Sequence, residues 1–171
     1  MMNHIFVNCI AAGQIDWKSP LTAAHQPSIR DCHMIVQGDD NGPTVIAELA
    51  GPSAENLNRY AEFLARGYIV VGHSVEYHHG HLRVAMMQAG IDPCDGRVNT
   101  ICTMLGLVGV VPKFNGKRGW PKFDEVCHHY GLDRAGTETA EDNARVLARV
   151  FDIATRTGVE FEPKIWKDRH G

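Results

Sequence analysis

Five short apolar segments of the chain have the alternating or continuous pattern that is typical of β-strands. The second and third segments flank the turn-forming string Gly38-Asp39-Asp40-Asn41-Gly42, which predicts an antiparallel pair. The fourth segment is rich in β-branched residues and is interrupted by Gly72, which favours a buried strand followed by a sharp turn. The predicted strands cover residues 4–10, 28–37, 44–49, 68–71 and 98–104.

Apolar residues at intervals of three and four predict four helices between and after these strands. Ser53 and Ser74 precede the first two helices, and each is expected to cap its helix with the side-chain hydroxyl. In the second helix the inner stripe begins with His78, which shares a face with Leu82 and Met86. The predicted helices cover residues 54–66, 75–89, 121–130 and 137–157.

The order of these elements is three strands, a helix, a strand and a helix, followed by a short strand and two further helices. This order predicts a mixed α/β sheet with helices on both faces. We expect residues 1–158 to form one domain and residues 159–171 to form a polar C-terminal tail of unassigned structure.

The amino-acid composition mainly argues against certain classes of protein and of binding partner. The 171 residues carry a net charge of −3, so no global basic field indicates nucleic acid. The five cysteines include no Cys-x-x-Cys pair, which argues against a disulfide framework and for a reducing compartment. No apolar run approaches the ~20 residues of a membrane span. We therefore expect a cytoplasmic protein without a membrane partner.

Three strings, taken in order, resemble the three motifs of the DnaQ-like (DEDDh) 3′–5′ exonucleases. The first strand ends in Asn8-Cys9-Ile10-Ala11-Ala12-Gly13, where the family has Asp-x-Glu-Thr-Thr-Gly. The fourth strand leads into His73-Ser74-Val75-Glu76-Tyr77-His78 in place of His-Asn-x-x-Phe-Asp. The last helix carries Thr137-Glu138-Thr139-Ala140-Glu141-Asp142-Asn143 in place of His-x-Ala-x-x-Asp-Ala. The resemblance spans residues 4–157 and implies a ribonuclease H-like fold with a mixed five-stranded sheet flanked by helices.

The resemblance also implies which positions would carry catalysis. In the family, four carboxylates hold two metal ions and a histidine acts as general base; the matching residues here are Asn8, Ile10, His78, Asp142 and Thr137, and only Asp142 is retained. Two-metal hydrolysis places cations ~4 Å apart, and Mg²⁺ requires anionic oxygen ligands. We therefore expect a catalytically inactive domain without a metal cofactor. In place of metal binding, we expect Asp142 to hydrogen-bond His78 and to raise its pKa.

A rebuilt metal site is the alternative interpretation. An active 3′–5′ exonuclease with Mg or Mn would need at least three of five candidate ligands to converge: His73, Glu76, His78, Glu138 and Asp142. The histidines between positions 73 and 81 leave a transition-metal site open as well.

Basic and aromatic residues gather between positions 113 and 122. Cations contact phosphates, and an exposed tryptophan can stack on a base. The other interpretation makes Trp120 a core anchor and the cations a solvated loop. The string Trp120-Pro121-Lys122-Phe123-Asp124-Glu125-Val126 resembles the Trp-Pro-Lys-Leu-x-Glu helix start of phage-type and plasmid-type members of the family. The candidate nucleic-acid-binding residues are Lys113, Lys117, Arg118, Trp120, Lys122, His73 and Ser74.

The sequence therefore leaves two non-catalytic functions. One is binding of single-stranded nucleic acid, DNA or RNA, in an open groove beside the basic loop. The other is an interaction module that binds a protein partner or forms a homodimer through a large apolar surface.

Overall fold

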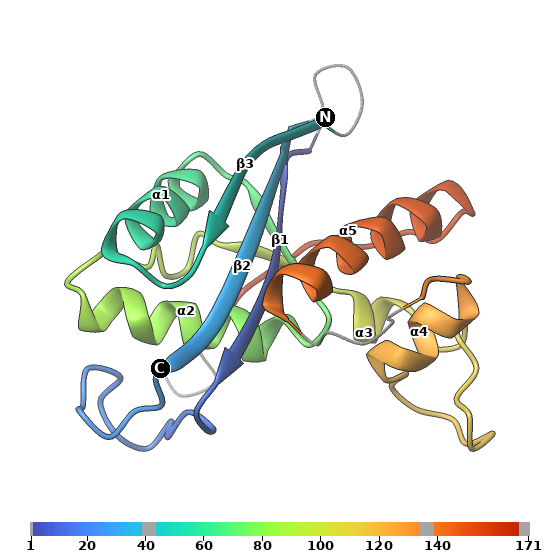
Figure 1. The fold of residues 1–171 in the computed structure, drawn as a ribbon, viewed down its shortest axis with the longest axis horizontal. Coiled ribbons are helices and arrows are strands. Elements are labelled where there is room, and N and C mark those ends of the chain that lie inside the picture. Colours follow the sequence, from blue (N-terminus) through green and yellow to red (C-terminus); the bar gives the residue numbers. More distant parts are fainter. Residues whose placement is uncertain (1, 39–43, 134–138, 168–171) are drawn as a thin grey trace.

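The computed structural model describes residues 2–38, 44–133 and 139–167, which form an open six-stranded mixed sheet with helices on both faces (Figure 1). The strand order across the sheet is β3-β2-β1-β4-β5-β6. The predicted mixed α/β architecture is confirmed, but the predicted number of five strands is wrong, because the C-terminal tail adds a sixth strand. The strands are β1 (His4–Ala11), β2 (Ile29–Gly38), β3 (Thr44–Ala50), β4 (Ile69–Gly72), β5 (Asn99–Cys102) and β6 (Lys164–Ile165).

Strand β1 lies inside the sheet and extends well past one of its two neighbours. It pairs with antiparallel β2 along its whole length, whereas it pairs with parallel β4 only from His4 to Phe6. Since β4 ends at Gly72, the last five residues of β1 have no pairing with it. Buried backbone N–H groups need hydrogen-bond partners, so this end of β1 must find them outside β4.

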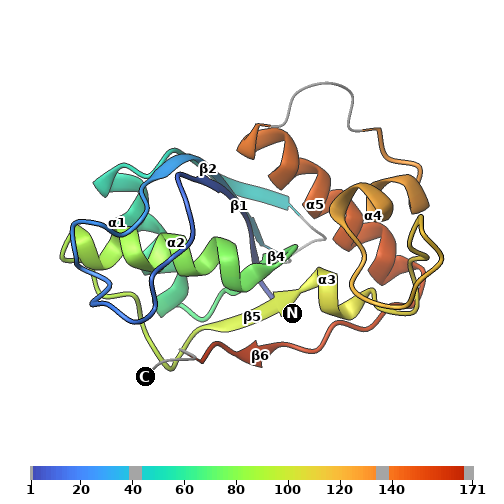
Figure 2. The ribbon, with the colours of Figure 1, turned by 90° about the horizontal axis from the view of Figure 1, so that it is seen from below.

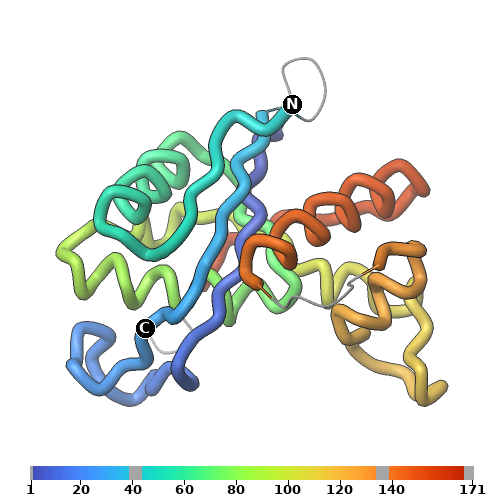
Figure 3. The backbone as a smooth tube through the Cα atoms, viewed as in Figure 1, coloured from blue at the N-terminus to red at the C-terminus, as the bar shows by residue number. Residues whose placement is uncertain are grey.

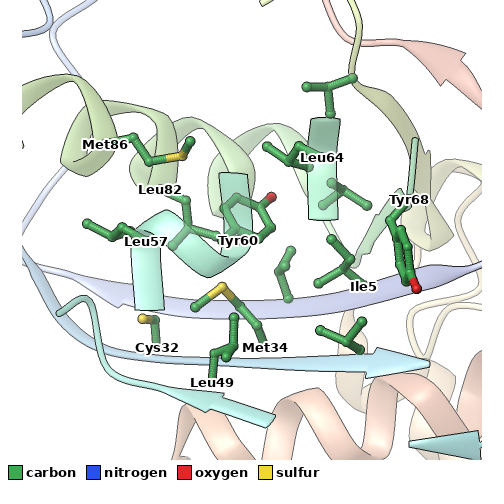
Figure 4. Packing of buried hydrophobic residues seen from close by; sticks show 14 of the residues in the cluster. Ile5, Cys32, Met34, Leu49, Leu57, Tyr60, Leu64, Tyr68, Leu82 and Met86 are labelled. Atoms are coloured by element: carbon green, nitrogen blue, oxygen red, sulfur yellow. The ribbon is translucent and has the colours of Figure 1, made fainter. Parts of the chain in front are cut away.

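Helices α1 (Ala54–Ala65) and α2 (Val75–Gln88) cover one face of the sheet. Ser53 caps α1 as predicted, its hydroxyl accepting a hydrogen bond from the backbone N–H of Asn56 at 3.2 Å. The main apolar core lies between these two helices and the strands (Figure 4). Its largest fully buried members include Tyr60, Leu82, Met86 and Met34.

The entry into α2 differs from its prediction. Ser74 adopts a left-handed backbone conformation, with φ 68° and ψ 57°, and its hydroxyl makes no capping hydrogen bond. The predicted capping role of Ser74 is therefore wrong. The turn is tight, because a Cβ on Gly72 would lie only 2.9 Å from the Cα of Val75. Glycine at position 72 thus allows the chain to reverse directly from β4 into α2.

Helix α2 is buried on nearly every side, including all residues from His78 to Val84. The loop that follows β1 lies alongside this helix (Figure 2). A Cβ on Gly80 would lie 3.1 Å from Ile15 and 3.4 Å from Trp17, so the absence of a side chain lets this loop pack closely on α2. The weak apolar stripe of α2 in the sequence is explained by this second layer of cover.

Helix α5 (Ala140–Arg156) covers the opposite face of the sheet (Figures 1 and 3). There Leu147 packs with Phe6. The predicted helix began at residue 137; residues 134–138 lie outside the described part, and Thr139 caps the helix. Helices α3 (Thr103–Gly106) and α4 (Phe123–His129) lie beside the sheet. Leu107 and Val126 there share a smaller core with Val150 of α5.

The predicted tail contributes to the fold. Strand β6 pairs antiparallel with β5, and Trp166 directly after it is buried. The rings of Trp166 and His79 form a T-shaped contact with centroids 5.1 Å apart, and the guanidinium of Arg83 lies over the Trp166 ring. Among the described residues, no helix is long and apolar enough to cross a bilayer.

Candidate functional site

Asn8 and Ile10 lie near the end of β1, on the face of the sheet that α5 covers. Alternation along the strand places them on the same side as Phe6, which packs beneath α5. Both side chains are half-buried, and they lie opposite His33 and Asp31 of β2. Ile10 has no atom that could bind a cation, and Asn8 has only a neutral amide.

The side chain of His78 accepts a hydrogen bond from the part of β1 that extends past β4. Its Nδ1 accepts a hydrogen bond from the backbone N–H of Cys9 at 3.0 Å, and its Nε2 donates to the carbonyl oxygen of His73 at 3.1 Å. These two bonds define a neutral imidazole with its proton on Nε2. The His78 side chain therefore connects the end of β1 to the turn before α2.

Burial lowers the pKa of His78 to about 4. The predicted hydrogen bond from His78 to Asp142, and the raised pKa of His78, are therefore wrong, because both ring nitrogens already bond to the backbone. Asp142 instead accepts a hydrogen bond from the hydroxyl of Thr139 at 2.6 Å in the first turn of α5.

A polar network that sequence reasoning missed attaches the start of α5 to the sheet. The carboxylate of Asp31 accepts a hydrogen bond from the backbone N–H of Ala140 at 2.9 Å. Arg145 donates to both oxygens of Glu48, at 3.0 and 2.7 Å, and the His33 ring lies 3.2 Å from the same carboxylate. Desolvation raises the pKa of Glu48, but these hydrogen bonds outweigh it and the pKa is lowered. The available signal was the pair of polar residues Asp31 and His33 next to the apolar run of this strand.

The histidines that could rebuild a metal site are engaged within the fold. The His73 ring lies 3.1 Å from the hydroxyl of Thr103 through Nδ1 and 3.0 Å from the carbonyl of Pro121 through Nε2. Both ring nitrogens of His81 face carbonyl oxygens, of Tyr77 at 2.8 Å and of Gly13 at 3.0 Å.

His79 also points inward, where its Nδ1 lies 2.9 Å from the hydroxyl of Tyr60, and burial lowers its pKa to about 4. Within residues 2–38, 44–133 and 139–167, no three His, Cys, Asp or Glu residues are grouped to hold a metal ion. Thr137 and Glu138 lie outside the described residues. Among the five candidate ligands, both ring nitrogens of His73 and of His78 are thus engaged in contacts within the fold. The side chain of Glu76 is exposed.

A cavity of about 440 Å³ opens between the loop after β1, the start of α2 and the C-terminal tail. Aromatic rings from all three segments line it, and Ser74 lies at its edge. Its aromatic and polar lining includes Trp17, Tyr77, Trp166, Ser74, Glu76 and Lys167.

The basic segment predicted to bind nucleic acid is largely exposed. Trp120 is 62% exposed and Phe114 is 67% exposed, so the interpretation of Trp120 as a core anchor is wrong. Lys117, Arg118 and Lys122 are exposed, and Lys113 is half-buried. The contact from His73 to Pro121 attaches this segment to the end of β4, beside the second motif. His73 and Ser74 are consecutive, and they connect the basic segment to the aromatic cavity.

Comparison with solved structures identifies the fold. The chain is similar to the nuclease domain of 3'hExo, a DEDDh family member, in a crystallographic structure bound to rAMP. The match has a TM-score of 0.60 and 11% sequence identity, and it covers 95% of this chain and 96% of the other. Searches of protein-family models and of curated proteins gave no match. The mixed sheet and its flanking helices are thus those of a ribonuclease H-like exonuclease fold.

Proposed function

We propose that this chain is a catalytically inactive, exonuclease-like domain that binds single-stranded nucleic acid through residues 113–122. The observation that carries the proposal is the pair of exposed rings, Phe114 and Trp120, among four cations. An exposed ring stacks on unpaired bases of any sequence, and cations contact phosphates. An amphipathic loop of this kind suits a single strand better than a duplex, whose bases are already stacked.

The proposed absence of catalysis is supported by what the motif residues do. His78 hydrogen-bonds two backbone groups, and Ile10 has no ligand atom. Asp142 is the one retained carboxylate of the four, and two divalent cations require several anionic oxygens. The aromatic cavity beside Ser74 offers room for a base of the bound strand.

The test is fluorescence anisotropy of a labelled single-stranded oligonucleotide titrated with the protein at two salt concentrations. Replacing Lys117 and Arg118 together by alanine is expected to weaken binding and to make it less dependent on salt, because two phosphate contacts are lost. The matched control replaces the exposed Arg59 and Arg66, which lie in and directly after α1, away from this loop and from the cavity, and should leave binding unchanged. Absence of binding by the unmodified protein at low salt would refute the proposal.

The alternative, an active exonuclease with rebuilt ligands, is separated by a cleavage assay on the same oligonucleotide. Incubation with Mg²⁺ or Mn²⁺ should leave the strand intact. Degradation that depends on Mn²⁺ and disappears with Asp142→Ala would establish the alternative instead, with Glu76, Glu138 and Asp142 as its remaining carboxylates.

A protein interaction module is a second candidate, supported by a separate observation. Leu105 and Val108 are each 46% exposed and Val110 is 40% exposed, next to the basic segment. Exposed apolar side chains that gather on one surface are typical of interaction sites. We also propose that the chain is a degenerate relative of phage-type or plasmid-type members, on the strength of Trp120-Pro121-Lys122.

A further inference from the structure

Glu125 is a buried carboxylate next to an exposed loop. It lies in the first turn of α4, and the residue is 4% exposed. A buried glutamate is uncommon unless its oxygens are fully hydrogen-bonded. The partners of this one lie at two separate points of the chain, on either side of the loop.

One carboxylate oxygen accepts a hydrogen bond from the backbone N–H of Phe114 at 2.9 Å, and the other accepts from the N–H of Lys122 at 2.6 Å. The second bond is the usual one from a glutamate at the third position of a helix to its cap residue. The first is not local, because it reaches back eleven residues. Together the two bonds close the segment between Phe114 and Lys122 into a loop with fixed ends.

The interior of this loop has local turn bonds but little apolar anchoring. The side chain of Asn115 accepts from the N–H of Lys117 at 3.0 Å, and the N–H of Gly116 donates to the carbonyl of Lys113 at 2.9 Å. Pro121 is buried, whereas every residue from Phe114 to Trp120 is exposed. The Phe114 ring also contacts the ring of His128 in α4, with centroids 5.4 Å apart. The course of the loop between this contact and Pro121 therefore depends on how its two ends are held.

We infer that Glu125 is a positioning residue that holds Phe114 and Trp120 as a preformed pair of rings for unpaired bases. The inference rests on the proposed single-strand binding and adds to it the residue that organises the loop. Phe114 is bonded directly through its own N–H, and Trp120 is two residues from the bonded Lys122. A loop that is already ordered before binding loses little conformational entropy on association, so less of the binding free energy is offset.

The electrostatics agree with this geometry. The hydrogen bonds from the backbone N–H groups of Lys122 and Phe114, with Lys113 and Lys122 nearby, lower the pKa of Glu125. The carboxylate therefore stays charged at neutral pH and keeps both acceptors. Its charge repels phosphate, so an electrostatic role alone would make removal of Glu125 strengthen binding.

The experiment compares Glu125→Gln with the unmodified protein in two measurements. A glutamine side chain has one acceptor oxygen, so it can hold one end of the loop and turns an N–H toward the other. Amide hydrogen exchange is expected to speed up at Phe114 and Lys122 and to stay unchanged in the strands. The affinity for a labelled single strand is expected to fall about three- to tenfold, whereas removal of the negative charge alone would raise it. The control is Glu55→Gln, an exposed first-turn glutamate of α1, which should change neither readout.

Unchanged or tighter binding by Glu125→Gln, together with faster exchange at the two amides, would overturn the positioning role and leave single-strand binding in place. Failure of the unmodified protein to bind any single strand would overturn both proposals. If Glu125→Gln does not fold, Glu125→Asp serves instead. It keeps the charge but is shorter by one methylene, and it should give the same loss of affinity because it cannot reach both ends.

Discussion

His78 is 8% exposed and gives both ring nitrogens to backbone groups, whereas Trp120 is 62% exposed at the surface of the basic segment. The first residue occupies a motif position that would carry a metal ligand in an exonuclease, and the second lies outside the three motifs. Both ring nitrogens of His78 are thus engaged within the fold, whereas the side chains from Phe114 to Trp120 are exposed to solvent. A match to a motif position therefore does not by itself identify a site, because a side chain whose polar atoms all bond within the fold has no capacity left for a ligand.

The contrast predicts different responses to change in the two regions. Changes at the motif positions should affect folding stability, and changes in the basic segment should affect binding.

Acidification should lower the unfolding free energy of the protein, because two buried histidines are neutral in the folded state. His78 and His79 have pKa values of about 4 in the folded protein, against ~6.5 in the unfolded chain. The unfolded state therefore binds more protons below pH ~6.5, and stability falls as pH decreases toward 4. By pH 5 the loss should be roughly 2 kcal/mol for each histidine, or ~4 kcal/mol together. Urea unfolding at a series of pH values measures it, and His79→Gln should remove about half of the dependence. A stability that is flat between pH 7.5 and 5 would contradict the assigned roles.

Replacement of His78 by alanine should destabilise the fold by ~3 kcal/mol, since it leaves the Cys9 N–H without its partner and opens a cavity. The measurement is urea unfolding at neutral pH, with the exposed His25→Ala as the control. A decrease in the free energy of unfolding of less than ~1 kcal/mol would show that the hydrogen bonds of His78 contribute little to folding stability.

Trp120→Ala should separate the two regions most clearly. Its exposed ring contributes little to packing, so unfolding free energy should stay within ~0.5 kcal/mol of the unmodified protein. Affinity for a single strand should fall about tenfold, or ~1.4 kcal/mol, because one stacking contact is lost. The exposed Ile165→Ala, on strand β6, is the matched control for both measurements. A large loss of stability with unchanged binding would reverse the assignment of the two regions.

The smallest effect is expected for Arg145→Gln. This guanidinium pairs with Glu48 and Glu141, but about half of its side chain is exposed to solvent. Exposed ion pairs contribute less than ~1 kcal/mol, and 0.5 M salt should reduce the difference further. A loss that stays the same at high salt would mean that the bond to Glu48 acts through geometry rather than charge.

Much of the fold was predictable because its signals are local. The alternation of residues 4–10, the turn cluster after Gln37 and the cap at Ser53 each depend on neighbours a few residues away. These patterns predicted the main elements and the mixed sheet. The tail was not predicted as a strand, because β6 has only two residues and its pairing with β5 gives no periodic signal.

The candidate site was predictable only in part. The sequence identified the basic and aromatic segment, but the exposure of Trp120 depends on how α3, α4 and α5 pack together. The Glu125 bond to Lys122 follows from helix-start chemistry, whereas its bond to Phe114 depends on the path of the loop between them.

The order of the elements, and the absence of a carboxylate from Asn8, Ile10 and His78, could be read from the amino-acid sequence. What these three side chains contact depends on tertiary packing. His78 is 69 residues from Cys9, and it bonds the Cys9 N–H because β4 ends at Gly72 while β1 continues to Ala11. Strand ends that stop at different levels leave backbone groups unpaired, and which side chain meets them is set by packing between distant parts of the chain.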